Sequence, residues 1–193
     1  MHWIDPAHLP ATKGKVSQFL LNPHGELDGL VLDGRLQVHF PPHLSKQVGQ
    51  HIATGERVEV RGVRPRDAEV VAAVSLKNAE GREIVDHGPA AISDDAHDTH
   101  AAPPPGPPAG KPMDVQGQVV LPLFGPKGEL RGALLDDGTS LRMPPHAAAE
   151  LRHYLTPGVH VQAWGNGAKN KWGRTVEVDE IAELVDVYAA VAQ

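Results

Sequence analysis

The 193-residue chain contains no cysteine, which excludes disulfides, thiolate metal sites and cysteine nucleophiles. It also has no run of about 18 apolar residues, the length that a membrane-spanning helix needs. The first residues lack the basic start and apolar core of a secretory signal. By elimination, these absences predict a cytoplasmic protein.

Aromatic residues and positive charge are also scarce. Aromatics make up 4% of the chain, and the net charge is −6 with the histidines neutral. Few rings are therefore available to stack on bases, and the overall charge opposes non-specific attraction to DNA or RNA. The chain carries no Walker-type phosphate loop, no nucleophile elbow and no zinc-protease motif. We expect a non-enzymatic protein without a cofactor.

What the chain does contain is an internal repeat. Residues 14–62 align with residues 117–165 without a gap, and sixteen of these 49 positions are identical. Pro-His-Gly-Glu-Leu at 23–27 becomes Pro-Lys-Gly-Glu-Leu at 126–130, and Pro-Pro-His occurs at both 41–43 and 144–146. A period this long exceeds that of a solenoid unit, so the repeat predicts two copies of one domain.

The composition between the copies predicts a linker. Residues 89–113 are rich in proline, alanine and aspartate and cannot build a core, so we interpret them as flexible. The remaining divisions are a tail over 1–11, a first domain over 12–88 and a second over 114–193. His97 and His100 lie among aspartates in the linker, but a flexible segment does not preorganise a metal site and the spacing matches no metal signature. We predict no metal site.

Each copy reads as strand, strand, strand, helix, strand, strand. Leu36, Val38 and Phe40 alternate with polar residues, as in a half-buried strand. Leu44 and Val48 begin a four-residue spacing typical of a short helix. The first copy appends a hairpin over 76–88, and the second ends with a predicted helix over 184–193.

This order of elements resembles the OB-fold, the five-stranded barrel named for binding oligonucleotides and oligosaccharides. The chain as a whole resembles a tandem OB-fold protein of bacterial type. The resemblance covers both repeats and rests on element order. It implies a mainly β fold with two five-stranded barrels, each with a helix between strands three and four.

The repeated Pro-Pro-His has two interpretations. Proline cannot donate to a strand ladder and is favoured at helix starts, so the motif can be a strand stop fused to a helix start. Alternatively, His43 and His146 are equivalent ligands or bases. Neither histidine has a partner at an informative spacing, so the first interpretation is preferred and any chemical role stays open.

The resemblance implies a binding face on the outside of strands two and three, together with the loops that flank it. In the first copy this face contains Arg35, Gln37 and His39, and the loop between strands four and five contains Arg64 and Arg66. The second copy offers a larger set around an aromatic loop: Arg131, Arg142, Trp164, Lys169, Lys171, Trp172 and Arg174.

These residues predict weak or selective binding of single-stranded DNA or RNA through the second barrel. Trp164 and Trp172 would stack on bases, while Lys169, Lys171 and neighbouring arginines would contact phosphates. Two alternatives remain open at this stage. In one, the lysines stay solvated, the tryptophans cover the barrel edge, and the protein docks a protein partner through a groove or sheet edge. In the other, it binds a small molecule or oligosaccharide. Whether the barrels pack together is not specified by the sequence.

Overall fold

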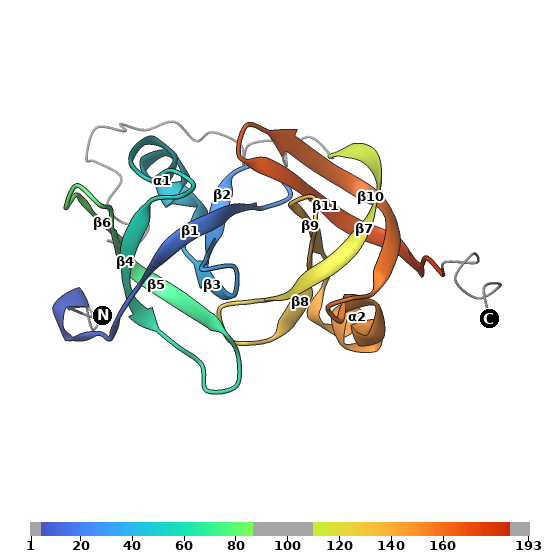
Figure 1. Cartoon of the computed structure of the whole chain (residues 1–193), viewed down its shortest axis with the longest axis horizontal. Helices are drawn as coiled ribbons and strands as arrows, with labels where there is room; N and C mark the ends of the chain where they lie inside the picture. Colours follow the sequence, from blue (N-terminus) through green and yellow to red (C-terminus); the bar gives the residue numbers. More distant parts are fainter. Residues whose placement is uncertain (1–4, 87–109, 186–193) are drawn as a thin grey trace, which may run out of the picture.

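In the computed structural model, which describes residues 5–86 and 110–185, the chain forms two closed five-stranded β-barrels (Figure 1). The predicted fold class is therefore confirmed, with a helix between strands three and four of each barrel. None of the helices in these two ranges has the length and apolar character that a membrane crossing needs.

Barrel 1 is built around a long first strand. Its elements are η1 (Pro6–His8), β1 (Ala11–Leu21), β2 (Leu27–Leu32), β3 (Leu36–His39), η2 (Pro42–Leu44), α1 (Ser45–His51), β4 (Arg57–Val63), β5 (Val70–Lys77) and β6 (Glu83–Val85). The first half of β1 pairs with β4 and the second half with β2. A parallel pairing of β3 with β5 closes the barrel. β6 pairs with β5, which confirms the extra hairpin predicted for the first copy.

Barrel 2 repeats this topology. Its elements are β7 (Lys111–Phe124), β8 (Leu130–Leu135), β9 (Thr139–Arg142), α2 (Pro145–Glu150), η4 (Arg152–Leu155), β10 (His160–Asn170) and β11 (Gly173–Glu183). Here β9 pairs in parallel with β11. Because β7 begins at Lys111, the last three residues assigned to the linker belong to a strand. Nearly all of the predicted C-terminal helix lies outside the described residues.

The Pro-Pro-His motif ends a strand and starts a helix in both barrels. β3 ends at His39 and η2 begins at Pro42, while β9 ends at Arg142 and α2 begins at Pro145. Proline has no N–H for a strand ladder and its fixed φ suits the first helical turn, so both changes occur at one place. The preferred interpretation of the motif is confirmed as a structural one.

Each barrel has its own apolar core, and a third cluster lies between the barrels. Val16 belongs to the core of barrel 1 and Val119 to that of barrel 2, but Leu20 and Leu123 pack against each other in the third cluster. Strict alternation along β1 would place Val16 and Leu20 on one face. Irregularities in the pairing of β1 with β2 and of β7 with β8 lie between these positions and divide the face between two cores.

Candidate functional site

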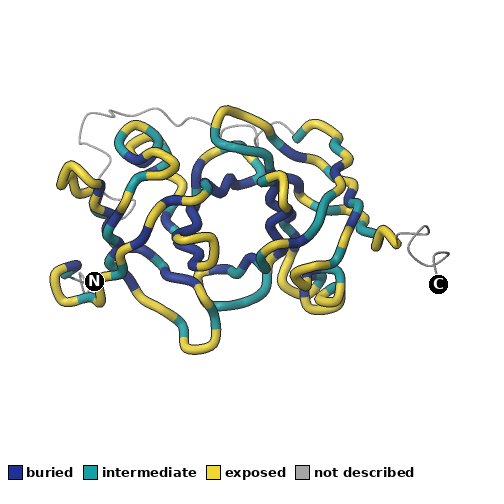
Figure 2. The backbone as a smooth tube through the Cα atoms, in the orientation of Figure 1, coloured by how far each residue is buried: buried dark blue, intermediate teal, exposed yellow. Residues whose placement is uncertain are grey.

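The two barrels pack together through the outer faces of their first three strands. The cluster between them contains Leu20 and Val31 of barrel 1 together with their repeat counterparts, 103 positions further on, Leu123 and Leu134. The barrels are thus related by an approximate two-fold axis. Figure 2 shows buried backbone on both sides of this contact, which we call the junction. The face that the OB-fold resemblance assigned to ligand is therefore largely used for packing.

Polar side chains fix the junction as well. Gln37 is 2% exposed, and its side-chain amide bonds both backbone groups of Phe124: Nε2 donates to the carbonyl at 2.9 Å, and Oε1 accepts from the N–H at 2.8 Å. His39 Nε2 donates to the same carbonyl oxygen. Gln37 thus pairs with the end of β7 as a neighbouring strand would. His39, a predicted ligand-binding residue, takes part in this contact.

A partly buried ion pair crosses the junction beside them. Arg142 Nη2 donates to Asp28 Oδ1 at 2.7 Å, and the two side chains are only 18% and 15% exposed. Burial raises the pKa of the Asp28 carboxyl above its ordinary value, and Arg142 and His39 only partly offset that rise. Arg142 Nε is buried without a hydrogen-bond partner among the described residues. Arg142 is thus committed to Asp28, which leaves it poorly placed to neutralise a phosphate.

The loops complete the junction in a symmetric way. The β1–β2 turn of barrel 1 contacts the β10–β11 hairpin: Asn170 Nδ2 donates to the Gly25 carbonyl at 2.7 Å. At the other end, Gly128 in the β7–β8 turn lies against Pro65 and Ala68 in the β4–β5 loop. Both glycines have positive φ, +84° and +86°, in the turn conformation that other residues rarely adopt. We call these the Gly25 end and the Gly128 end, at the top and bottom of the junction in Figure 1.

Trp172, at the tip of the β10–β11 hairpin, packs onto the other barrel. A Cβ placed on Gly49 of α1 would lie 2.6 Å from its ring, and the indole joins the apolar core of barrel 1 as a half-buried member. The Lys171 ammonium lies 4.7 Å from the ring centroid. In this arrangement the indole anchors one barrel to the other and is not open to a base.

An apolar cleft of about 720 Å³ opens along the junction. Both prolines of each Pro-Pro-His motif line it, so the repeat contributes to both of its sides. Pro23 and Pro126, from the turns at the Gly25 and Gly128 ends, also line it, so the cleft runs between these ends. The remaining lining includes the apolar side chains Phe40, Val63, Phe124 and Met143 and the polar groups Asp28, His39, Arg131, Arg142 and Glu177.

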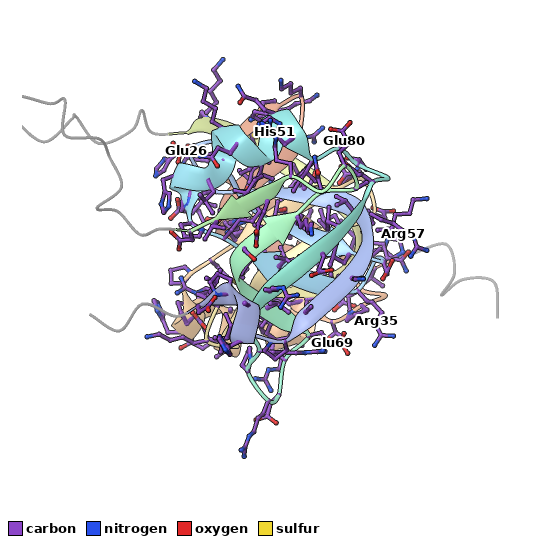
Figure 3. All side chains as sticks on the ribbon, turned by 90° about the vertical axis from the view of Figure 1, so that its left-hand side faces the viewer. Glu26, Arg35, His51, Arg57, Glu69 and Glu80 are labelled. Carbon is purple, nitrogen blue, oxygen red and sulfur yellow. The ribbon has the colours of Figure 1, made fainter. Side chains whose placement is uncertain are left out.

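All but one of the other predicted arginines are paired at the surface; the exception among the described residues is Arg66. Arg35 bonds Glu69 at 3.1 Å, as Figure 3 shows for these two labelled side chains. Three more ion pairs are Arg64–Glu69 at 4.0 Å, Arg131–Glu129 at 3.0 Å and Arg174–Asp137 at 4.0 Å. His43 forms a hydrogen bond of 3.0 Å with Asp86. Exposed pairs of this kind contribute little stability, but they reduce the charge available to a phosphate.

Four exposed cations without such pairs lie at the ends of the junction, while others, such as Lys15 and Lys77, lie elsewhere on the surface. Lys169 and Lys171 occupy the Gly25 end, and Arg66 and Lys127 the Gly128 end; all four are exposed and form no ion pair with another described residue. The sequence identified three of them but missed Lys127, although it repeats His24 in the aligned turn. It also omitted Phe124 and Asp28, because their position depends on how the barrels pack.

Trp164 lies apart from this group. It is 37% exposed, and its direct strand neighbours are Asp114 on β7 and Glu180 on β11. Its outward orientation, with Val161 and Ala163 buried, agrees with the sequence pattern. The structure does not bring it together with Trp172 and the basic loop.

No family model matches the chain, and a search of curated proteins finds no relative. Among solved structures, the wild-type single-stranded DNA binding protein from Thermus aquaticus is similar at 14% identity, with 91% of each chain covered and a TM-score of 0.28. A deletion mutant of that protein (delta 228-252 R190A) is similar at 12% identity, with 91% of this chain and 93% of the other covered and the same TM-score. At such a low score the function must be argued from this chain's own residues.

Proposed function

We propose that this protein is a non-enzymatic binding protein that holds single-stranded nucleic acid along the junction between its barrels. The observation that carries the proposal is the apolar cleft, which ends on both sides at loops with unpaired, exposed cations. Non-specific single-strand sites combine backbone contacts from cations with surfaces on which bases stack. In this protein the two functions would be divided between the loop ends and the cleft.

The loop ends would contact the phosphates. Lys169 and Lys171 would contact phosphates at the Gly25 end, and Arg66 and Lys127 would contact them at the Gly128 end. Four contacts to a single strand correspond to a slope of about −3 for log affinity against log salt. With a net charge of −6 on the whole protein, we expect binding to be weak at physiological salt and measurable at low salt.

The cleft would receive bases rather than phosphates. Its charged groups include the paired Asp28–Arg142 and the exposed Glu177, so it does not form a positive channel. Its partly buried Phe124 offers an aromatic surface, and a base stacked on such a ring contributes about 1–3 kcal/mol. Both barrels would then contribute, with the hairpin lysines of the second barrel as the predicted phosphate contacts.

Fluorescence anisotropy of labelled single-stranded DNA and RNA, measured across a salt series, tests this. Replacing Lys169 and Lys171 together by alanine should weaken binding about tenfold at low salt and make the salt slope shallower by roughly 1.4. A matched control replaces Lys15 and Lys77, two exposed lysines of barrel 1 away from the junction, and should change affinity far less. Equal losses in both variants would contradict a localised site.

The second candidate is a protein-interaction module in which the cleft docks an apolar segment of a protein partner. The apolar lining and the net negative charge favour it. Two results together would favour this function over the first. The protein would not bind nucleic acid at low salt, and a partner protein would co-purify with the wild type but not with Phe124→Ala.

A further inference from the structure

The outer face of β10 around Trp164 differs between the two barrels, although the strands are repeats of each other. Trp164 occupies the position of Arg61 on β4, 103 residues earlier. In barrel 1 the row across the sheet is Ala11, Arg61 and Ser75. In barrel 2 the corresponding row is Asp114, Trp164 and Glu180. One copy therefore has an arginine here, and the other an indole between two carboxylates.

In barrel 1 a segment of polypeptide partly covers this face and leaves a depression of about 450 Å³ between itself and the sheet. The residues before β1 fold back over the sheet, with Pro6 of η1 buried and the Ala7 carbonyl accepting a hydrogen bond from Arg61 Nη1 at 3.2 Å. Figure 1 shows η1 beside the β4 side of barrel 1, away from the junction. Ser75 is 2% exposed beneath this cover and the β6 hairpin. The fold thus already binds a short chain segment at this position.

Among the described residues of barrel 2, no segment forms a hydrogen bond with Trp164 as the Ala7 carbonyl does with Arg61. Trp164 remains 37% exposed, and it borders a shallow depression of about 600 Å³ that also includes Pro112, Met113 and Asn166. Asp114 and Glu180 are exposed and form no ion pair with another described residue. Their charge disfavours a phosphate backbone here and favours a cation.

We propose that this face of barrel 2 docks a basic, extended segment of a partner protein. A lysine or arginine side chain of that segment lies on the Trp164 indole and reaches Asp114 or Glu180, which combines a cation–π contact with a charge-assisted hydrogen bond. Acidic groups alone would not define a site. The chain segment that partly covers the same face of barrel 1 is the second, independent observation that points to a polypeptide.

This surface is separate from the proposed nucleic-acid site, and its partner is positively charged whereas nucleic acid is negatively charged. The proposal is tested with the full-length protein and a fluorescein-labelled ten-residue peptide of alternating arginine and glycine, with a glutamate–glycine peptide as the reference. The basic peptide should bind and the acidic peptide should not. Trp164→Ala should weaken binding about 3- to 10-fold, as expected for the loss of a cation–π contact.

A pair of matched charge variants separates the site from general attraction to an acidic protein. The double variant Asp114→Asn with Glu180→Gln should weaken peptide binding by a similar factor. The double variant Glu80→Gln with Glu83→Gln removes the same charge from barrel 1 and should retain most of the affinity for the peptide. In addition, the indole N–H resonance of Trp164, identified by its absence in Trp164→Phe, should shift on peptide addition.

Three outcomes would overturn the proposal. They are unchanged affinity in Trp164→Ala, equal losses in the two charge variants, and a Trp164 resonance that does not move. Binding that occurs only after residues 186–193 are removed would also overturn it, because the chain's own end would then be the occupant.

Discussion

Replacing Gly49 by alanine tests whether the hairpin of barrel 2 holds barrel 1 in the way the structure describes. Gly49 lies inside α1, where alanine is normally more stable than glycine by about 0.5–1 kcal/mol. Here the new Cβ would lie 2.6 Å from Trp172 Cζ2, 3.2 Å from Cε2 and 3.4 Å from Leu27 Cδ1. The ring has to move, and such overpacking typically costs about 1–3 kcal/mol.

The expected net result is a loss of up to about 2 kcal/mol in the free energy of unfolding, where helix propensity alone predicts a gain. In a Trp172→Ala background the obstacle is absent, so Gly49→Ala should stabilise the protein by about 0.5–1 kcal/mol. The double-mutant cycle should therefore give a coupling energy of about 1–3 kcal/mol.

Urea unfolding followed by far-ultraviolet circular dichroism is the suitable assay, because Trp172 is one of only three tryptophans and its removal alters the fluorescence signal. A coupling energy below about 0.5 kcal/mol would refute the reasoning. In that case Trp172 would not pack on α1, and the anchoring of the barrels at the Gly25 end would be wrong.

Two further predictions concern the polar contacts of the junction. Gln37→Ala leaves the Phe124 N–H without its partner and removes one of the two donors to the Phe124 carbonyl, so it should destabilise the protein by about 1–3 kcal/mol in urea unfolding. Gln47→Ala on the exposed side of α1 should change stability by less than about 0.5 kcal/mol. Burial raises the pKa of Asp28 in the folded state, so the folded protein binds a proton at this carboxyl more tightly than the unfolded chain does. The stabilisation that comes from this proton is present at acid pH. It is lost as the pH rises above 3.8, the ordinary pKa of the carboxyl. The stability of the wild type relative to Asp28→Asn should therefore fall as the pH rises above about 4; a relative stability that rises instead would show that the pair with Arg142 outweighs burial.

The repeat made the architecture of each barrel predictable. The identical positions are those that a barrel of this kind needs: turn glycines such as Gly25 and Gly128, strand-ending prolines, and core residues such as Val58 and Val161. Turn chemistry and in–out alternation are local properties, so a sequence displays them directly.

The candidate site was predicted only in part. The hairpin lysines were identified because charge in a loop between strands is visible in sequence and stays exposed in the structure. Gln37 was placed correctly on the outward side of its strand, yet it is 2% exposed, because that side faces the other barrel. Alternation specifies which side of a strand a residue occupies, but it does not specify whether water or another domain lies there.

By itself, the sequence determined that two copies of one small barrel exist and where their strands, turns and helices begin. Only the tertiary structure decided that the copies pack face to face, that Arg142 is matched by Asp28, and that Trp172 anchors a partner barrel while Trp164 stays exposed between carboxylates. The physical reason is the separation along the chain over which each kind of interaction acts. Turn and strand preferences act between residues a few positions apart, whereas burial at the junction depends on surfaces that the chain brings together from more than one hundred residues away.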